Sequence, residues 1–147
     1  MHPEPQLELR VASFRDLEAI TLYQILKLRS DVFVVEQECF YADLDGRDTE
    51  PGTRHVWLSR GDEILAYLRI LDDGETRRIG RVVTAPEARS GGYASRLMRH
   101  ALEVIGDRPC TLEAQAHLTG FYNRFGFTQA GPGYVEDDIP HVPLRRG

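Results

Sequence analysis

The amino-acid sequence predicts an α/β fold, with a mixed, mostly antiparallel sheet of about seven strands flanked by helices. Three observations predict it. Strand-like segments recur between tight turns over residues 54–84, as in an antiparallel meander. A strongly amphipathic helical segment follows at residues 93–105. Another strand-like segment, residues 110–116, comes next, and such a strand–helix–strand unit brings some parallel pairing into the sheet.

The first part of the chain predicts one strand and one long helix. Apolar and polar residues alternate over residues 7–12, which is typical of a half-buried strand. Ser13 is a candidate N-cap with Asp16 in the place of a capping-box acid, and the helix is expected to run to about Phe33. One face of this helix carries Leu22, Ile25, Leu26, Arg29 and Phe33. Residues 34–53 are less regular and hold acidic and aromatic side chains.

Three consecutive strands are predicted in the middle of the chain, at residues 54–60, 63–71 and 77–84. Gly61-Asp62 has the composition of a two-residue hairpin turn with glycine first. Asp72-Asp73-Gly74 has the composition of the next turn. Each strand is therefore expected to pair antiparallel with the one before it.

A helix and a loop follow this meander. Pro86 and Gly91-Gly92 frame the loop, residues 93–105 form the helix, and Gly106 stands where a C-cap belongs. The apolar stripe of the helix consists of Ala94, Leu97, Met98, Ala101, Leu102 and Ile105.

The C-terminal part of the chain predicts a further strand, a short helix and two last strands. The strand covers residues 110–116, and the helix covers residues 118–125 and ends at Gly126. The last strands are expected at residues 127–130 and 141–146.

Length and composition limit the classes of protein that fit. A chain of 147 residues suits one domain, so residues 1–147 are expected to form a single unit. The net charge is −5 and the basic residues are spread along the chain, which argues against a nucleic-acid binder. No apolar run approaches the roughly 18 residues of a membrane span, and residues 1–5 lack a signal pattern. Cys39 and Cys110 belong to no CxxC unit, so reduced thiols and a cytoplasmic location are expected.

The segment from Arg89 to Ala94, RSGGYA, carries the clearest chemical signal. It lies between a predicted strand and a predicted helix, where glycines let successive N–H groups point at one place. The start of the helix adds the positive end of the helix dipole, so pyrophosphate is the expected ligand. A turn that merely needs glycine is the alternative. The dinucleotide fingerprint G-x-G-x-x-G and the Walker pattern are both absent.

These residues resemble the acyl-CoA signature of GNAT acetyltransferases, Arg/Gln-x-x-Gly-x-Gly/Ala. Arg89, Gly92 and Ala94 fill it here, and the block Phe121–Phe127 resembles the family's Phe/Leu-Tyr-x-x-x-Gly-Phe. Gln115 stands where the family usually has Asn. Five further segments are similar to the ElaA branch of that superfamily, namely residues 32–37, 43–48, 80–83, 114–118 and 138–141.

The resemblance implies a fold, a co-substrate and a set of site residues. The strand that ends at Thr84 and the strand at 110–116 are expected to splay apart around the pantetheine arm of acetyl-CoA. Tyr122 is expected to act as the general acid for the departing thiolate, because an ordinary tyrosine stays protonated at neutral pH. The resemblance assigns to coenzyme A the backbone groups of Val82, Val83 and Thr84 and the residues Arg89, Ser90, Gly91, Gly92, Tyr93, Ala94, Ser95, Gln115 and Tyr122.

The general base is left open by the sequence. Many relatives carry a Glu on the strand before the phosphate loop, but here that strand has Arg78 and Arg81 and no acid. The candidates elsewhere are Glu36, Glu113, His55, His117 and His141, and a water molecule relayed to a carboxylate is a further alternative.

Metal and serine-hydrolase sites are not expected. The acidic segment Asp43–Asp48 lacks the ligand order of an EF-hand loop, so an acidic turn near the acceptor cleft is the preferred interpretation. The histidines lack metal-ligand spacing, and no serine sits in a G-x-S-x-G elbow.

The predicted function is therefore transfer of an acetyl group from acetyl-CoA to an amine on a small molecule or peptide, by direct attack on the thioester. A non-catalytic acyl-CoA sensor on the same fold is the alternative. The acids at residues 36–50 favour a cationic acceptor, whereas Arg69 and Arg81 favour the opposite. The acceptor and the oligomeric state, a homodimer included, stay open.

Overall fold

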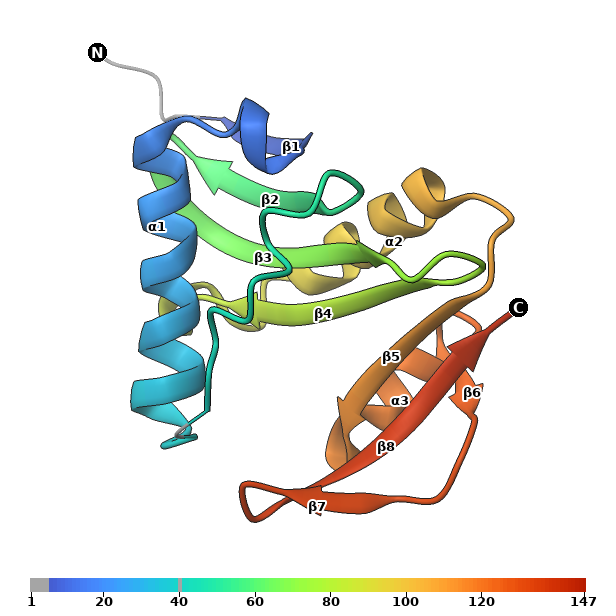
Figure 1. The fold of residues 1–147 in the computed structure, drawn as a ribbon. Helices are drawn as coiled ribbons and strands as arrows, with labels where there is room; N and C mark the ends of the chain where they lie inside the picture. Colours follow the sequence, from blue (N-terminus) through green and yellow to red (C-terminus); the bar gives the residue numbers. More distant parts are fainter. Residues whose placement is uncertain (1–5, 40) are drawn as a thin grey trace.

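The computed structural model describes residues 6–39 and 41–147 and has a single mixed sheet at its centre (Figure 1). Within those residues the sheet has eight strands in the order β1-β2-β3-β4-β5-β8-β6, and β7 pairs with β8 alone. The strands are β1 (Leu7–Ala12), β2 (Arg54–Arg60), β3 (Glu63–Asp72), β4 (Arg77–Thr84), β5 (Cys110–Gln115), β6 (Thr128–Gln129), β7 (Tyr134–Glu136) and β8 (Ile139–Arg146).

Helices cover both faces of the sheet. Figure 1 shows α1 (Ala19–Arg29) in front of β2, β3 and β4, and α2 (Tyr93–Ile105) behind them. The short α3 (Thr119–Asn123) lies beside β5 and β8. Each face has its own apolar core: Ile25, Leu28 and Val32 pack on the first, and α2 contributes Leu97, Met98, Ala101 and Ile105 to the second.

The sheet separates between β4 and β5. These strands run parallel, but only Arg77 with Cys110 and Arg78 with Thr111 are in register. Beyond those pairs Figure 1 shows the two strands diverging. Every other pairing in the sheet is antiparallel, as the sequence predicts. The sheet therefore opens at its centre into a V.

Strand β4 has a bulge close to the point where it separates from β5. Tyr67 pairs with Val83 and Arg69 pairs with Gly80, so β4 carries one more residue than β3 between the two pairs. Arg81 takes up the extra residue with a positive φ of 53°, a conformation that is uncommon for a residue with a side chain. The bulge turns the backbone of β4 at the point where the sheet opens.

The predicted elements are largely confirmed, with two differences. Ser13 precedes a short 3₁₀ turn, Phe14–Asp16, and α1 begins only at Ala19; Ser13 makes no side-chain cap. The helix then continues past Phe33 as a π-helical segment, Ser30–Glu36. The difference arises because the hydroxyl of Ser13 bonds the side chain of Asp16, at 3.2 Å, instead of a backbone N–H.

The second difference lies near the C-terminus. The strand expected at residues 127–130 is reduced to β6, and an unpredicted hairpin joins β7 to β8. Its turn consists of Asp137 and Asp138, both with positive φ. No helix in the described residues is long and apolar enough to cross a membrane. Residues 1–5, where a signal pattern was sought, lie outside the described residues.

Candidate active site

The glycine-rich loop lies at the start of α2. A 3₁₀ turn, Pro86–Ala88, leads into it, and Gly92 is the N-cap of the helix with a left-handed φ of 75°. A Cβ at Gly92 would meet no atom within 4 Å, so its φ, not lack of space, favours glycine there. The loop lines a hollow of about 270 Å³ together with Thr84, Phe121 and Arg124. Among the predicted residues, Thr84 and the whole run from Arg89 to Ser95 meet at this hollow.

The guanidinium of Arg89 forms an ion pair with Glu36, the last residue of the π-helical segment. Its two terminal nitrogens donate to the two carboxylate oxygens of Glu36, at 2.6 and 2.8 Å. These hydrogen bonds hold the pKa of Glu36 below its usual value. Glu36 is therefore a carboxylate in an ion pair, which makes it a weak candidate for the general base.

A second cavity, of about 410 Å³, lies where β4 and β5 separate. The bulged part of β4, residues 80–82, lines one wall, and residues 112–115 of β5 line another. Ile79 of β4 also lines the cavity. The remaining lining residues come from the segment after α1, from α3 and the turn before it, and from the β7–β8 hairpin, namely Phe33, Gln37, Cys39, Tyr41, Leu118, Tyr122, Glu136, Asp137, Ile139 and His141. We refer to this cavity as the cleft.

Tyr122 is the buried tyrosine of the cleft. Its side chain is held edge-on between the rings of Phe121 and Phe127, with centroids 5.0 and 6.4 Å away. The residue is 5% exposed, and its burial raises the pKa of the hydroxyl to about 12. The hydroxyl makes no hydrogen bond within the part of the chain that the structure describes. It is a protonated donor without a partner in residues 6–39 and 41–147.

The other predicted coenzyme residues divide between the two hollows. Val82 and Gln115 line the cleft, and the amide of Gln115 donates to the side chain of Gln37 at 3.3 Å. The side chain of Val83 lines neither hollow, because it packs in the core beneath α1. A role for Val83 is therefore confined to its backbone.

Two of the candidate bases lie away from the cleft. His55 is 1% exposed, and its ring nitrogens lie 2.6 Å from the hydroxyl of Tyr67 and 3.0 Å from the carbonyl oxygen of Asp48. Burial lowers the pKa of His55, and both of its nitrogens are engaged. His117 is exposed and lines neither hollow. The structure thus gives His55 a packing role and leaves His117 at the surface.

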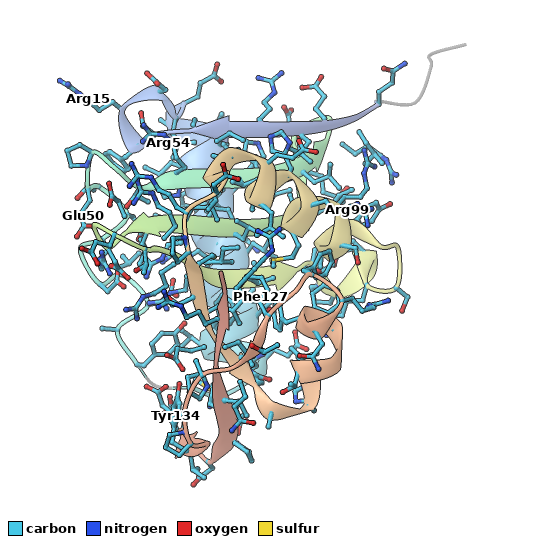
Figure 2. All side chains as sticks on the ribbon, turned by 90° about the vertical axis from the view of Figure 1, so that its right-hand side faces the viewer. Arg15, Glu50, Arg54, Arg99, Phe127 and Tyr134 are labelled. Carbon is cyan, nitrogen blue, oxygen red and sulfur yellow. The ribbon has the colours of Figure 1, made fainter. Side chains whose placement is uncertain are left out.

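The remaining candidates, Glu113 and His141, both line the cleft. Nδ1 of His141 lies 2.7 Å from the carbonyl oxygen of Ile139, and a carbonyl only accepts, so Nδ1 carries the proton. Nε2 of the neutral ring is then the basic nitrogen. Tyr134 stacks on this ring, with centroids 5.5 Å apart, and donates its hydroxyl to Glu113 at 2.7 Å. Figure 2 shows Tyr134 at the end of the molecule remote from β1.

The acidic segment at residues 43–48 binds arginines. Arg29 is fully buried, and it bonds Asp43 at 3.1 Å and Asp48 at 2.8 and 3.1 Å. Burial alone would raise the pKa of Asp48, but Arg29 and Arg69 hold it below the usual value. The buried guanidinium and carboxylates stabilise one another, because each has lost its hydration and would otherwise be an unpaired buried charge. The segment is thereby fixed against α1.

The same segment neutralises the two arginines that face it from the sheet. Arg69 bonds Asp45 at 2.9 Å and Asp48 at 3.1 Å. Arg81 lies with Nε 2.9 Å from an oxygen of Asp43, without hydrogen-bond alignment, and its Nη2 donates to the Asp43 carbonyl at 3.1 Å. Neither arginine therefore offers an uncompensated charge to an anionic acceptor. No group of three or more His, Cys, Asp or Glu in the described residues is placed to hold a metal ion.

Sequence reasoning missed several residues of the two hollows. Phe121 of α3 and Arg124, the C-cap of that helix, line the hollow at the glycine loop, and Tyr41, Glu136 and Asp137 line the cleft. The motif Phe121–Phe127 contains two of them, so its spacing could have indicated them. The hairpin residues reach the cleft only because β7 adds to β8 at one end of the sheet.

Comparison with known proteins identifies the family of this chain. The family model described as acetyltransferase (GNAT) domain matches residues 19–146. The UPF0039 protein Rv2851c of Mycobacterium tuberculosis is 47% identical over 143 residues, which cover 94% of this chain and 92% of that protein. Protein ElaA of Escherichia coli is 43% identical over 138 residues, which cover 89% of this chain and 90% of ElaA.

Solved structures support the same fold and family. The crystal structure of Escherichia coli ElaA superposes with a TM-score of 0.91 at 40% identity, covering 97% of this chain and 100% of that one. An acyl-CoA N-acyltransferase from Pseudomonas aeruginosa also gives 0.91, at 41% identity, covering 95% and 99%. An aminoglycoside 6'-N-acetyltransferase complexed with coenzyme A shares the fold, with a TM-score of 0.72 at 13% identity over 93% and 96%. The chain therefore belongs to the GNAT acetyltransferase family, in the branch that includes ElaA.

Proposed function

We propose that this protein is an N-acetyltransferase that moves the acetyl group of acetyl-CoA to the amine of a small molecule or peptide. Membership of the GNAT family supports acyl-CoA-dependent acyl transfer in general. The observation that carries the finer proposal is the hydroxyl of Tyr122. The side chain is buried, and its protonated hydroxyl has no hydrogen-bond partner among the described residues and faces a cleft between two separating strands.

The residues around both hollows fit coenzyme A. Backbone N–H groups at the start of the 13-residue helix α2 suit the pyrophosphate, because they add their donors to the positive end of the helix dipole. Beyond Arg78 and Thr111, the facing edges of β4 and β5 are not paired with each other, which suits the amides of pantetheine. When bound, acetyl-CoA supplies the thioester carbonyl that the acceptor attacks.

Tyr122 is proposed as the general acid and His141 as the general base. With a pKa near 12, Tyr122 keeps its proton at neutral pH and can give it to the departing thiolate sulfur. His141 has Nδ1 bonded to a carbonyl, so its Nε2 is free to take a proton from the acceptor ammonium. The nucleophile is then the neutral amine, and no covalent enzyme intermediate is needed.

The test is incubation with acetyl-CoA and a panel of amines, with thiol release and the mass of the acceptor both followed. Acceptor-dependent thiol release with one acetyl group added per thiol is expected. In His141→Asn this rate should fall by about 10² or more at neutral pH, with less deficit at a pH where the acceptor is already neutral. Tight acetyl-CoA binding without thiol release by any amine would instead identify a non-catalytic acyl-CoA sensor.

A further inference from the structure

We propose that the cleft takes a linear polycationic amine, a diamine or polyamine, as its acceptor, with Glu113, Glu136 and Asp137 binding the charges away from the reacting nitrogen. The proposal rests on the proposed acetyl transfer and adds the class of acceptor. The three carboxylates come from β5, from the last residue of β7 and from the β7–β8 turn, and all three line the same cavity. They therefore meet through the topology of the sheet.

The charge balance of the cleft is negative. Arg81 is the one Arg or Lys among the described residues that line it, and Asp43 and Asp45 lie 2.9 and 3.4 Å from its guanidinium. Within the described part of the chain, no Arg, Lys or His is ion-paired with Glu113, Glu136 or Asp137. A cleft lined by charges of one sign raises the local concentration of the opposite ion.

A second and independent feature of the cleft points to a ligand. Tyr122 is 95% buried, as its exposure of 5% shows, and its hydroxyl is aimed at the cleft without a partner in the described residues. The hydroxyl oxygen is not among the fully buried unpaired atoms of the described residues, so it opens into the cleft, where it can donate to a bound molecule. The reacting end of the acceptor is therefore expected beside Tyr122, with its remaining charges toward the hairpin.

One ring that lines the cleft, that of His141, is backed by the ring of Tyr134, which lies outside the lining. Tyr134 and His141 stack nearly parallel, with an interplanar angle of 13°. The hydroxyl of Tyr134 donates to Glu113, which fixes the direction of that carboxylate. The other aromatic rings that line the cleft are those of Phe33, Tyr41 and Tyr122, and such rings bind alkyl chains by contact and cations on their faces.

The volume of the cleft favours a slender acceptor. The cavity of about 410 Å³ must also admit the thioester end of the donor. That is near the lower end of ordinary ligand pockets, which run from roughly 300 to 1,000 Å³. A linear chain of methylenes fits the remaining space better than a multi-ring aminoglycoside does.

The test compares spermidine, butylamine and a multi-ring aminoglycoside as acceptors at saturating acetyl-CoA. The kcat/KM for spermidine should exceed that for butylamine by about tenfold or more. Glu136→Gln and Asp137→Asn should each raise the KM for spermidine about three- to tenfold and raise that for butylamine much less. Asp138→Asn is the matched control, because Asp138 shares the turn and its positive φ but does not line the cleft. Its KM should stay at the wild-type value.

Calorimetry of spermidine binding in the presence of coenzyme A distinguishes a wrong acceptor class from a failure of the proposed acetyl transfer. The acceptor class would be overturned if butylamine and spermidine released thiol at equal rates. It would also be overturned if Glu136→Gln and Asp137→Asn left the KM for spermidine unchanged. Either result would leave acetyl transfer intact. A preference for the aminoglycoside would overturn the linear shape. Absence of both turnover and spermidine binding would overturn the acceptor class, and absence of thiol release with every amine would overturn the proposed function as well.

Discussion

Arg89 and Glu36 form a two-pronged ion pair, with donor–acceptor distances of 2.6 and 2.8 Å, between the glycine-rich loop and the end of the π-helical segment. The residue after Glu36 is Gln37, which lines the cleft and accepts from Gln115. The pair thus links the loop of the proposed phosphate site to a wall of the proposed acceptor site. Both side chains are nearly half exposed, so the pair is weak enough for a phosphate to compete with Glu36.

The first prediction follows from this competition. Glu36→Gln removes the charge that holds Arg89, so acetyl-CoA should bind about two- to threefold tighter at low salt. Arg89→Ala should weaken binding, and the gain from Glu36→Gln should vanish in the double variant. Calorimetry measures all three, with Glu75→Gln as a control, because Glu75 is exposed and lies in the β3–β4 turn. If none of these variants changes the affinity, the guanidinium of Arg89 has no part in the coenzyme site.

The second prediction concerns Gly92. Gly92→Glu places a negative charge where backbone N–H groups should meet phosphate, so acetyl-CoA affinity should fall by at least about 1–2 kcal/mol. Gly92→Ala controls for the left-handed φ of 75°, since its Cβ meets no neighbouring atom. The alanine variant should lose about 1 kcal/mol of stability and little affinity. Equal affinity in the glutamate variant and the wild type would remove this loop from the site.

The third prediction concerns the buried ion pairs of Arg29. Arg29→Met leaves Asp43 and Asp48 without their main partner, so the free energy of unfolding should fall by about 3–5 kcal/mol. Lys27→Met is the matched control two residues away, because its pair with Asp31 is exposed. It should change the stability little. Urea unfolding of both variants measures the difference, and equal stabilities would show that the network is not a stabilising anchor of the segment at residues 41–50.

The fourth prediction concerns acid. Burial lowers the pKa of His55, so the unfolded chain binds a proton that the folded chain resists, and stability should decline as pH falls below about 6.5. Hydrogen bonds from Arg69 hold the pKa of Asp45 well below its usual range, so a second decline should begin below about pH 4. Urea unfolding from pH 8 to pH 3 should show both declines. In His55→Gln the upper one should disappear and the lower one remain.

The meander and α2 could be predicted from the sequence because local rules decide them. Strand patterning with glycine turns placed β2 and β3, and the apolar stripe with Gly106 placed the 13-residue α2 at its observed bounds. The β7–β8 hairpin was missed because its strand residues Tyr134–Glu136 are exposed, and its turn uses Asp137 and Asp138 where glycine is the usual signal.

The site could be predicted only where a motif lies within one segment. The loop around Gly92 and the position of Tyr122 came from such motifs, and the structure places them at the two hollows. The sequence places Arg29 on the same helix face as apolar residues, but its partners are 14 and 19 residues away, and only folding brings them together. The acids of the hairpin reach the cleft for the same reason.

Turnover of Tyr122→Phe tests the central claim most directly. Phenylalanine keeps nearly the same volume in the contacts with Phe121 and Phe127, so stability and acetyl-CoA affinity should hardly change. If Tyr122 protonates the departing thiolate, kcat with a productive amine should fall by about 10²–10⁴ with the affinity for acetyl-CoA unchanged. The deficit should shrink for an acyl donor whose thiol is more acidic, because that thiolate leaves without help. A fall in kcat of less than about threefold in the folded variant would contradict the account and reduce Tyr122 to a packing residue.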